Sequence, residues 1–183
     1  MCERGEVHIS SLVGILVRMS NTAAAAHTII VIPCAAEKAE IASAARALYT
    51  SANFANTLAA AELEAIDTER VCGTSTKVMI LSAKHGLIEL DAIVAPYNTK
   101  MGEAGDIDAA AIAAQLAELA PSAIISLLPA AYRNRLAAAV AEINDDEDAQ
   151  WIDMMDTYED APGIGYQRGV VGSLKRTHAL IAA

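Results

Sequence analysis

Aromatic side chains are scarce in this sequence of 183 residues. They make up 4% of the chain, although 54% of its residues are hydrophobic, and alanine supplies much of that larger fraction. The large side chains of a core therefore have to come from isoleucine, leucine, valine and methionine. The length suits one domain that buries a substantial core.

Cysteine is also rare, and its spacing excludes two kinds of stabilisation. The three cysteines, Cys2, Cys34 and Cys72, are odd in number and widely separated. The chain contains no C-x-x-C or H-x-x-x-H pair. A disulfide framework and a structural zinc site are therefore not expected, and the pattern fits a protein of the reducing cytoplasm. No metal ligand is predicted.

Basic residues are outnumbered. The chain has 13 lysines and arginines against 23 acidic residues, which gives a net charge of −10. A surface of this sign is unsuited to the phosphate backbone of generic duplex DNA. Net charge does not describe a single cleft, however, so a local basic pocket is compatible with it.

Long hydrophobic runs are absent as well. The most apolar stretch near the amino terminus, 7–17, is interrupted by polar residues and followed by Arg18. It is too short to span a bilayer and lacks the cleavage pattern of a signal peptide, so no membrane association is expected. We expect 1–27 to be a flexible or peripheral extension and 28–183 to be the folded domain.

What the sequence does contain is an alternation of buried strands and helices. Short runs rich in β-branched residues predict strands at 28–32, 77–82 and 122–128, with a last short strand at 150–152. Helices are expected at 52–66, 106–119, 130–143 and 166–182, beside a helical turn at 42–48. Asp106 is expected to cap the second of these helices. This order predicts an α/β fold, a single layered domain with a mainly parallel central sheet flanked by helices.

Polar residues follow these strands directly. Cys34 comes after the first strand, the segment 82–85 ends the second, and Pro129 follows the third. The carboxyl ends of parallel strands lie at one edge of a sheet, where ligand crevices form. A single site at this edge is therefore predicted.

Cys34 and Lys38 are the first candidates for chemistry. A thiol at a helix entrance has a lowered pKa, and a partly desolvated lysine becomes nucleophilic. The alternative is a small buried cysteine beside a solvated lysine.

Thr50 and Ser51 precede the helix expected at 52–66. Orphan amides at a helix amino terminus favour an anion such as phosphate or carboxylate. The alternative is ordinary capping by Ser51, with Tyr49 and Phe54 in the core.

The segment 82–86 offers three further side chains and a glycine. Ser82 ends the strand, Lys84 can clamp an anion, and His85 can act as an acid, a base or a hydrogen-bond donor. Gly86 supplies an unusual backbone angle, and Tyr97 follows where it can close over a pocket. The alternative is a polar loop turned toward solvent.

Arg133, in the first turn of the helix after the third strand, is a candidate for gripping phosphate or carboxylate. Solvation at the surface is the alternative. A glycine-rich turn, "APGIGYQRG", leads through Gln167 into the final helix. Such turns occur in many folds, so by itself this one is weak support for phosphate binding.

Together these motifs resemble a known group of proteins. "LSAKHGLIELDAIVAPYNTKMG" resembles the signature of the YaaA-like peroxide stress proteins, and "ALYTSANF" and "AIISLLPAAYRNRL" resemble two of their other elements. The likeness is closer to a short bacterial and phage domain family of unknown function and fainter to the core domain of archaeosine synthase. The shared positions are Cys34, Lys38, Tyr49, Ser51, Phe54, Ser82, Lys84, Gly86, Pro96, Tyr97, Gly163, Gly165 and Gln167.

The resemblance implies base or nucleotide chemistry at the same sheet edge. Two residues depart from the family pattern: His85 replaces a commoner Tyr, and Asn98 a commoner Asp. If that Asp is a catalytic base in relatives, Asn98 puts catalysis here in question.

We therefore expect a cytoplasmic enzyme, bacterial or phage-encoded, that acts on a nucleotide, nucleobase or modified nucleic acid in the manner of a transferase or glycosidase. The rivals are a non-catalytic nucleic-acid or stress-response binder of the YaaA type and a phage-encoded inhibitor module. The sequence names neither a cofactor nor an oligomeric state.

Overall fold

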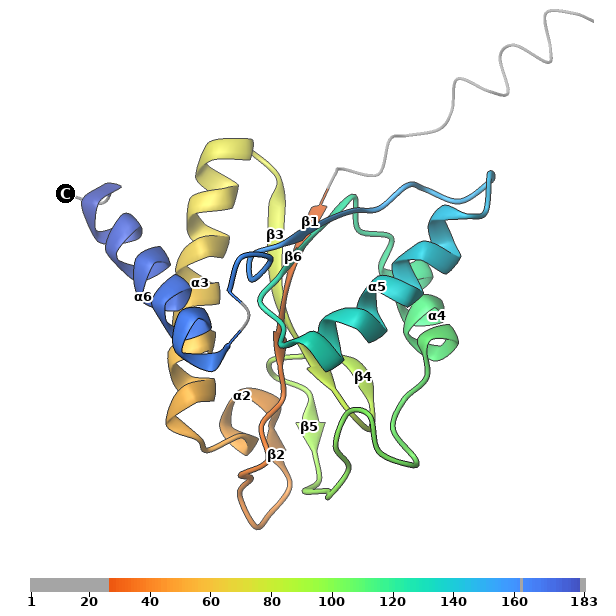
Figure 1. Cartoon of the computed structure of the whole chain (residues 1–183), viewed down its shortest axis with the longest axis horizontal. Helices are drawn as coiled ribbons and strands as arrows, with labels where there is room; N and C mark the ends of the chain where they lie inside the picture. The colour runs from red at the N-terminus through yellow and green to blue at the C-terminus, as the bar shows by residue number, and fades with distance from the viewer. Residues whose placement is uncertain (1–26, 162, 182–183) are drawn as a thin grey trace, which may run out of the picture.

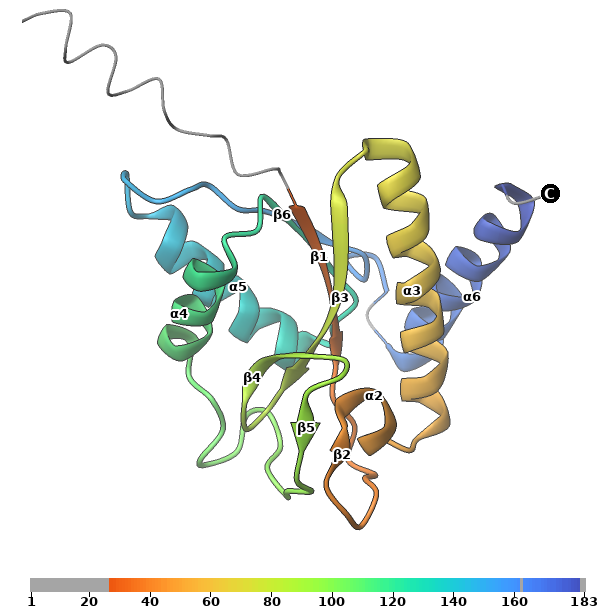
Figure 2. The same ribbon diagram turned by 180° about the vertical axis from the view of Figure 1, so that it is seen from behind.

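A computed structural model describes residues 27–161 and 163–181, and these form an α/β domain (Figures 1 and 2). Apart from His27, the extension expected at 1–27 lies outside the described residues. No helix in the described part of the chain combines the length and apolarity needed to cross a membrane.

The main sheet has five strands in the order β4-β3-β1-β6-β7. Four of them are parallel, namely β1 (His27–Pro33), β3 (Ser75–Ser82), β6 (Ala123–Ser126) and β7 (Asp153–Asp156), while β4 (Gly86–Glu89) pairs antiparallel with β3. The central strand β1 lies between β3 and β6, and its residues 29–32 are fully buried. A strand covered on both faces needs a continuous apolar run rather than an alternating one. The predicted α/β fold with a mainly parallel sheet is confirmed.

Helices cover both faces of this sheet (Figures 1 and 2). On one face lie α3 (Ala52–Cys72) and α6 (Ile164–Ile181); on the other lie α4 (Ala109–Leu119) and α5 (Ala130–Asn144). Alternate residues of β1 serve the two layers, since Ile30 and Ile32 join the cluster under α3 while Ile29 and Val31 join the one under α4 and α5.

Local capping explains where two helices begin. Ser51 Oγ accepts a hydrogen bond from Phe54 N at 3.2 Å and starts α3, as the sequence predicts. The expectation that Asp106 caps the next helix is wrong. Asp108 caps α4, accepting from Ala111 N at 2.8 Å, because the carboxylate of Asp106 is engaged by Arg135 at 3.0 Å.

The last strand also starts later than expected. Strand β7 begins at Asp153 instead of running over 150–152. The side chain of Asn144 accepts from Ile152 N at 2.9 Å and donates to Ile152 O at 3.0 Å, so this backbone is bonded to an amide instead of to the sheet.

Two small features beside the carboxyl edge have no counterpart in the sequence predictions. One is the antiparallel strand β4. The other is a two-stranded sheet of β2 (Ser43–Ala44) and β5 (Ile93–Val94), next to the short helix α2 (Ala45–Leu48). The pairing of β2 with β5 brings the segment after β1 beside the segment that leads to Tyr97 (Figure 2).

Candidate functional site

The connections of the sheet open a crevice between β1 and β6. From β1 the chain crosses through α3 on one face to β3, and from β6 it crosses through α5 on the opposite face to β7. The chain therefore leaves the carboxyl ends of these neighbouring strands in opposite directions. In open α/β sheets this reversal is where ligands bind.

Cys34 lies at the carboxyl end of β1. Its backbone N–H donates to Leu81 O at 3.1 Å, and its Sγ lies 3.2 Å from the hydroxyl oxygen of Tyr132 on α5. The expectation that Cys34 stands at a helix entrance is wrong, because the first described helix after it, α2, begins at Ala45. The contact with Tyr132 was not predicted.

Tyr97 joins two other hydroxyl groups. Its Oη lies 2.8 Å from Tyr49 Oη and 2.8 Å from Ser82 Oγ. Ser82 is fully buried and accepts hydrogen bonds from the backbone N–H groups of Lys84 at 3.2 Å and His85 at 3.0 Å. Both lone pairs of its oxygen are then occupied, so the hydroxyl of Ser82 donates to Tyr97.

These side chains form one group, the edge cluster, which consists of Cys34, Tyr49, Ser82, Tyr97 and Tyr132. Burial raises the pKa of Tyr49 to about 12. Burial is also the main cause that raises the pKa of Tyr97 and of Tyr132, and Cys34 adds to both shifts. The three tyrosines therefore keep their protons at neutral pH and act as hydrogen-bonding groups, not as bases.

Two lysines lie over the rings of the edge cluster. Lys38 Nζ is 4.3 Å from the ring centroid of Tyr97 and 5.7 Å from that of Tyr49, and Lys84 Nζ is 5.9 Å from that of Tyr97. Within the described ranges neither lysine pairs with a carboxylate. This part of an acidic protein thus carries local positive charge, held by the negative faces of the rings.

The imidazole of His85 lies nearly perpendicular to the same ring, at an interplanar angle of 87° and a centroid distance of 5.3 Å from Tyr97. Desolvation, and then the charge of Lys84, lower the pKa of this imidazole. His85 is therefore neutral at neutral pH and can accept or transfer a proton.

Gly86 shapes the loop that carries Lys84 and His85. It is buried with φ of +73°, and a Cβ there would lie 2.1 Å from Gln115 Oε1. Gln115 accepts from Leu87 N at 2.8 Å and donates to His85 O at 2.9 Å. The backbone requires glycine here, and Gln115, which no sequence motif singles out, fixes the loop.

Four other predicted residues lie apart from the edge cluster. Thr50 is exposed, and its N–H donates to Glu37 O. Ser51 caps α3. The guanidinium of Arg133 pairs with Asp156 on β7, with 2.9 Å between Arg133 Nη1 and Asp156 Oδ2. Gln167, on α6, donates its amide to Ala161 O at 3.3 Å.

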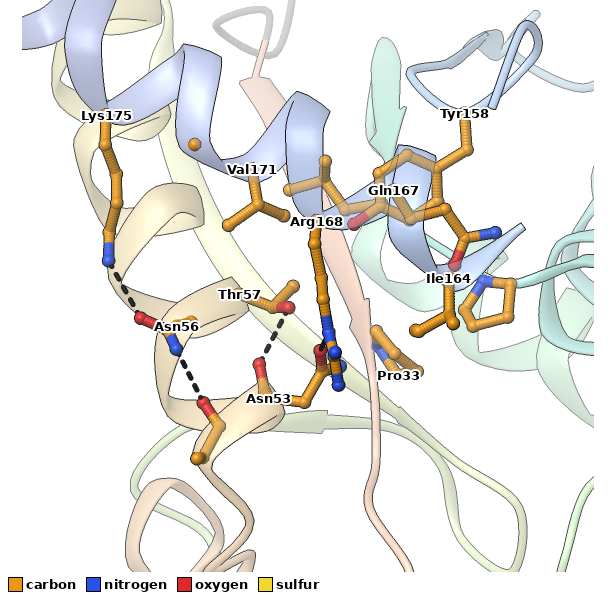
Figure 3. Close-up of a pocket in the computed structure, with 14 residues that line it drawn as sticks. Pro33, Asn53, Asn56, Thr57, Tyr158, Ile164, Gln167, Arg168, Val171 and Lys175 are labelled. Carbon is orange, nitrogen blue, oxygen red and sulfur yellow. Dashed lines mark hydrogen bonds between the residues drawn. The ribbon is translucent and has the colours of Figure 1, made fainter. Parts of the chain in front are cut away.

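A cavity of about 460 Å³ lies between α3 and α6, at the carboxyl ends of β1 and β6 (Figure 3). It borders the edge cluster through Pro33, which precedes Cys34, and of the predicted site residues Gln167 lines it. No local pattern predicts this cavity, because its walls come from segments far apart in the sequence. Its lining is Pro33, Ala52, Asn53, Asn56, Thr57, Leu127, Pro129, Tyr158, Ile164, Gln167, Arg168, Val171, Gly172 and Lys175.

Comparison with known proteins shows a family for this chain. A model described as "Family of unknown function (DUF6884)" matches residues 29–150. The match includes the whole edge cluster and ends before α6. No curated protein and no solved structure matches the chain.

Proposed function

Since this chain belongs to the DUF6884 family of unknown function, we propose a function from its own residues: it binds a nucleotide, a nucleobase or a modified base of nucleic acid at the carboxyl edge of its sheet and acts on it as an enzyme. The observation that carries this proposal is the edge cluster with Lys38, Lys84 and His85 around it, beside a cavity at the β1–β6 crevice.

The cavity is chemically suited to a heterocyclic ring. One end has Ile164 and Tyr158, near the amide of Gln167 (Figure 3). Ligand pockets typically combine apolar walls with a few convergent polar groups. An amide offers a donor and an acceptor side by side, which complements the edge of a base.

The groups around the edge cluster supply complementary chemistry. Lys84 and Lys38 can stabilise negative charge, His85 is a neutral imidazole for proton transfer, and Cys34 is a candidate nucleophile. The protonated tyrosines can donate hydrogen bonds to oxygens or ring nitrogens. This set fits a transferase or glycosidase of bases, in keeping with the resemblance to the YaaA-like proteins and to the archaeosine synthase core.

The first test is binding. Calorimetry and thermal shift would survey nucleobases, deazapurines, nucleosides and nucleotides. Lys84→Ala should weaken binding by about tenfold to a hundredfold, the worth of a charge-assisted contact, with little loss of stability because Lys84 is an exposed loop residue. Lys77→Ala, which removes an exposed lysine of β3, is the matched control. Equal effects of the two substitutions would contradict the proposed role of Lys84.

The second test separates an enzyme from a binder. Mass spectrometry of each bound ligand after incubation should reveal a product, and a tightly bound but unchanged ligand would favour a non-catalytic binder. Generic duplex DNA should bind no tighter than the micromolar range near physiological salt, given the net charge of −10. Tight duplex binding that weakens steeply with salt would overturn the small-ligand proposal.

A further inference from the structure

Two cations of α6 face the cavity and were not among the predicted site residues. Arg168 Nε donates to Asn53 Oδ1 at 3.1 Å, and Lys175 Nζ donates to Asn56 Oδ1 at 3.2 Å (Figure 3). The two are seven positions apart along the helix, about two turns, so both project from the same side toward α3. Each is held by a neutral amide, which orients the cation without cancelling its charge.

The chain has ten more acidic than basic residues, and several of its other cations pair with carboxylates. The arginines Arg46, Arg70, Arg133 and Arg135 each pair with a carboxylate. Within residues 27–161 and 163–181, Arg168 and Lys175 have no such partner, and no carboxylate lines their cavity. The cavity therefore has a positive wall on an acidic protein.

The opposite wall of the cavity, formed by α3, also contributes positive electrostatic potential. Ala52 and Asn53 belong to the first turn of α3, a helix of 21 residues, and both line the cavity. The amino-terminal end of α3, where the helix dipole is positive, therefore borders the cavity. Two cations and this helix end act together on one space of about 460 Å³.

We propose that Arg168 and Lys175 form the phosphate subsite of this protein, which takes the phosphate or pyrophosphate group of a nucleotide. This rests on the proposed function and narrows it: the ligand is a phosphorylated nucleoside instead of a free base. Lys175 and Asn56 lie at one end of the cavity, and Gln167 and Ile164 at the other (Figure 3). The phosphate occupies the first end, and the nucleoside extends past Pro33 toward the edge cluster.

The test is calorimetry on the full chain with inorganic pyrophosphate and with matched pairs of a nucleoside and its 5′-monophosphate and 5′-diphosphate. The phosphorylated member should bind at least tenfold more tightly than the nucleoside. Arg168→Gln and Lys175→Gln should each remove about tenfold to a hundredfold of phosphate affinity, the worth of one charge-assisted contact, and leave the affinity for the nucleoside unchanged.

Arg176→Gln is the matched control, because it removes one positive charge from the same helix at a residue that does not line the cavity and is bonded to Ser173. It should leave phosphate affinity within about twofold of the original protein. Urea unfolding of all three variants would show that the helix stays packed.

The outcomes separate the two proposals. Nucleoside binding without any gain from phosphate, or equal losses in Arg168→Gln and Arg176→Gln, would overturn the phosphate subsite and leave the proposed function standing. Pyrophosphate binding that depends on Arg168 and Lys175, with no nucleoside or base bound and no nucleotide bound more tightly than pyrophosphate, would support the subsite and refute the nucleotide function. Binding of none of these compounds would refute both.

Discussion

Removing one hydroxyl from the edge cluster tests whether its hydrogen bonds stabilise the fold. Tyr97→Phe keeps the ring that Lys38 and His85 contact but deletes the oxygen that lies 2.8 Å from both Ser82 Oγ and Tyr49 Oη. Ser82 is fully buried and Tyr49 is 3% exposed, so water can hardly replace the lost partner.

The expected magnitude follows from these contacts. A buried polar group left without a partner costs about 1–3 kcal/mol. Ser82 keeps its two backbone N–H donors, so its loss falls near the low end of that range, and Tyr49 adds a comparable loss. We expect Tyr97→Phe to lower the free energy of unfolding by about 2 kcal/mol, which corresponds to about 4–8 °C in Tm for a chain of this size.

Urea unfolding measures this free energy from the midpoint at an unchanged m-value. Tyr166→Phe, at a residue 70% exposed, is the control and should change stability by less than about 0.5 kcal/mol. In a double-mutant cycle, Ser82→Ala combined with Tyr97→Phe should cost less than the sum of the single changes, by at least about 0.5 kcal/mol. Additive effects, or a Tyr97→Phe protein as stable as the original, would refute a stabilising hydrogen bond between Ser82 and Tyr97.

Three further predictions concern the loop, its imidazole and the buried phenols. Gly86→Ala should lower the free energy of unfolding by about 2–4 kcal/mol in urea, because it combines backbone strain with displacement of the hydrogen-bonded Gln115. Gly73→Ala, at φ of +67° but with open space around it, should cost only about 1–2 kcal/mol. Equal costs of the two substitutions would contradict a clash between the new Cβ of residue 86 and Gln115. NMR titration should give His85 a pKa below about 6.5, and Lys84→Gln should raise that pKa. Because the native state disfavours the protonated imidazole, the protein should lose stability as the pH falls through the unfolded-state pKa of this histidine. An unshifted pKa would contradict the partial desolvation of His85. Burial raises the pKa of Tyr49 to about 12, so the stability that comes from its protonated phenol should be complete below about pH 10 and lost as the pH rises to about 12. Tyrosinate absorbance that grows in this pH range without a loss of stability would refute the burial of Tyr49.

Much of the site's location was predictable because it depends on strand ends. The apolar runs at 28–32 and 77–82 had to be buried strands, and parallel pairing brings their carboxyl ends together whatever the loops do. That is why Cys34, Ser82 and Lys84 meet at one edge of the sheet, where the sequence placed them. Ser51 as the cap of α3 was also a local property, fixed by one side chain and the next three residues.

The partners of the site's side chains were not predictable from local patterns. Cys34 contacts Tyr132, 98 positions away, only because α5 packs on the face opposite to α3. Arg133 was a candidate anion ligand, yet β7 brings Asp156 within 2.9 Å of it. The periodicity of the sequence does not predict which basic side chain on one element will form an ion pair with a carboxylate on another.

The sequence by itself determined the layered α/β architecture, the buried central strand and the sheet edge at which polar residues gather, because these follow from apolar runs, capping side chains and the geometry of parallel strands. Only the tertiary structure decided which groups share a space. The packing of α6 on α3 makes the cavity and sets Arg168 and Lys175 against neutral amides. Periodicity specifies the face that a helix buries but not the element it buries that face against, and a pocket between two helices depends on that choice.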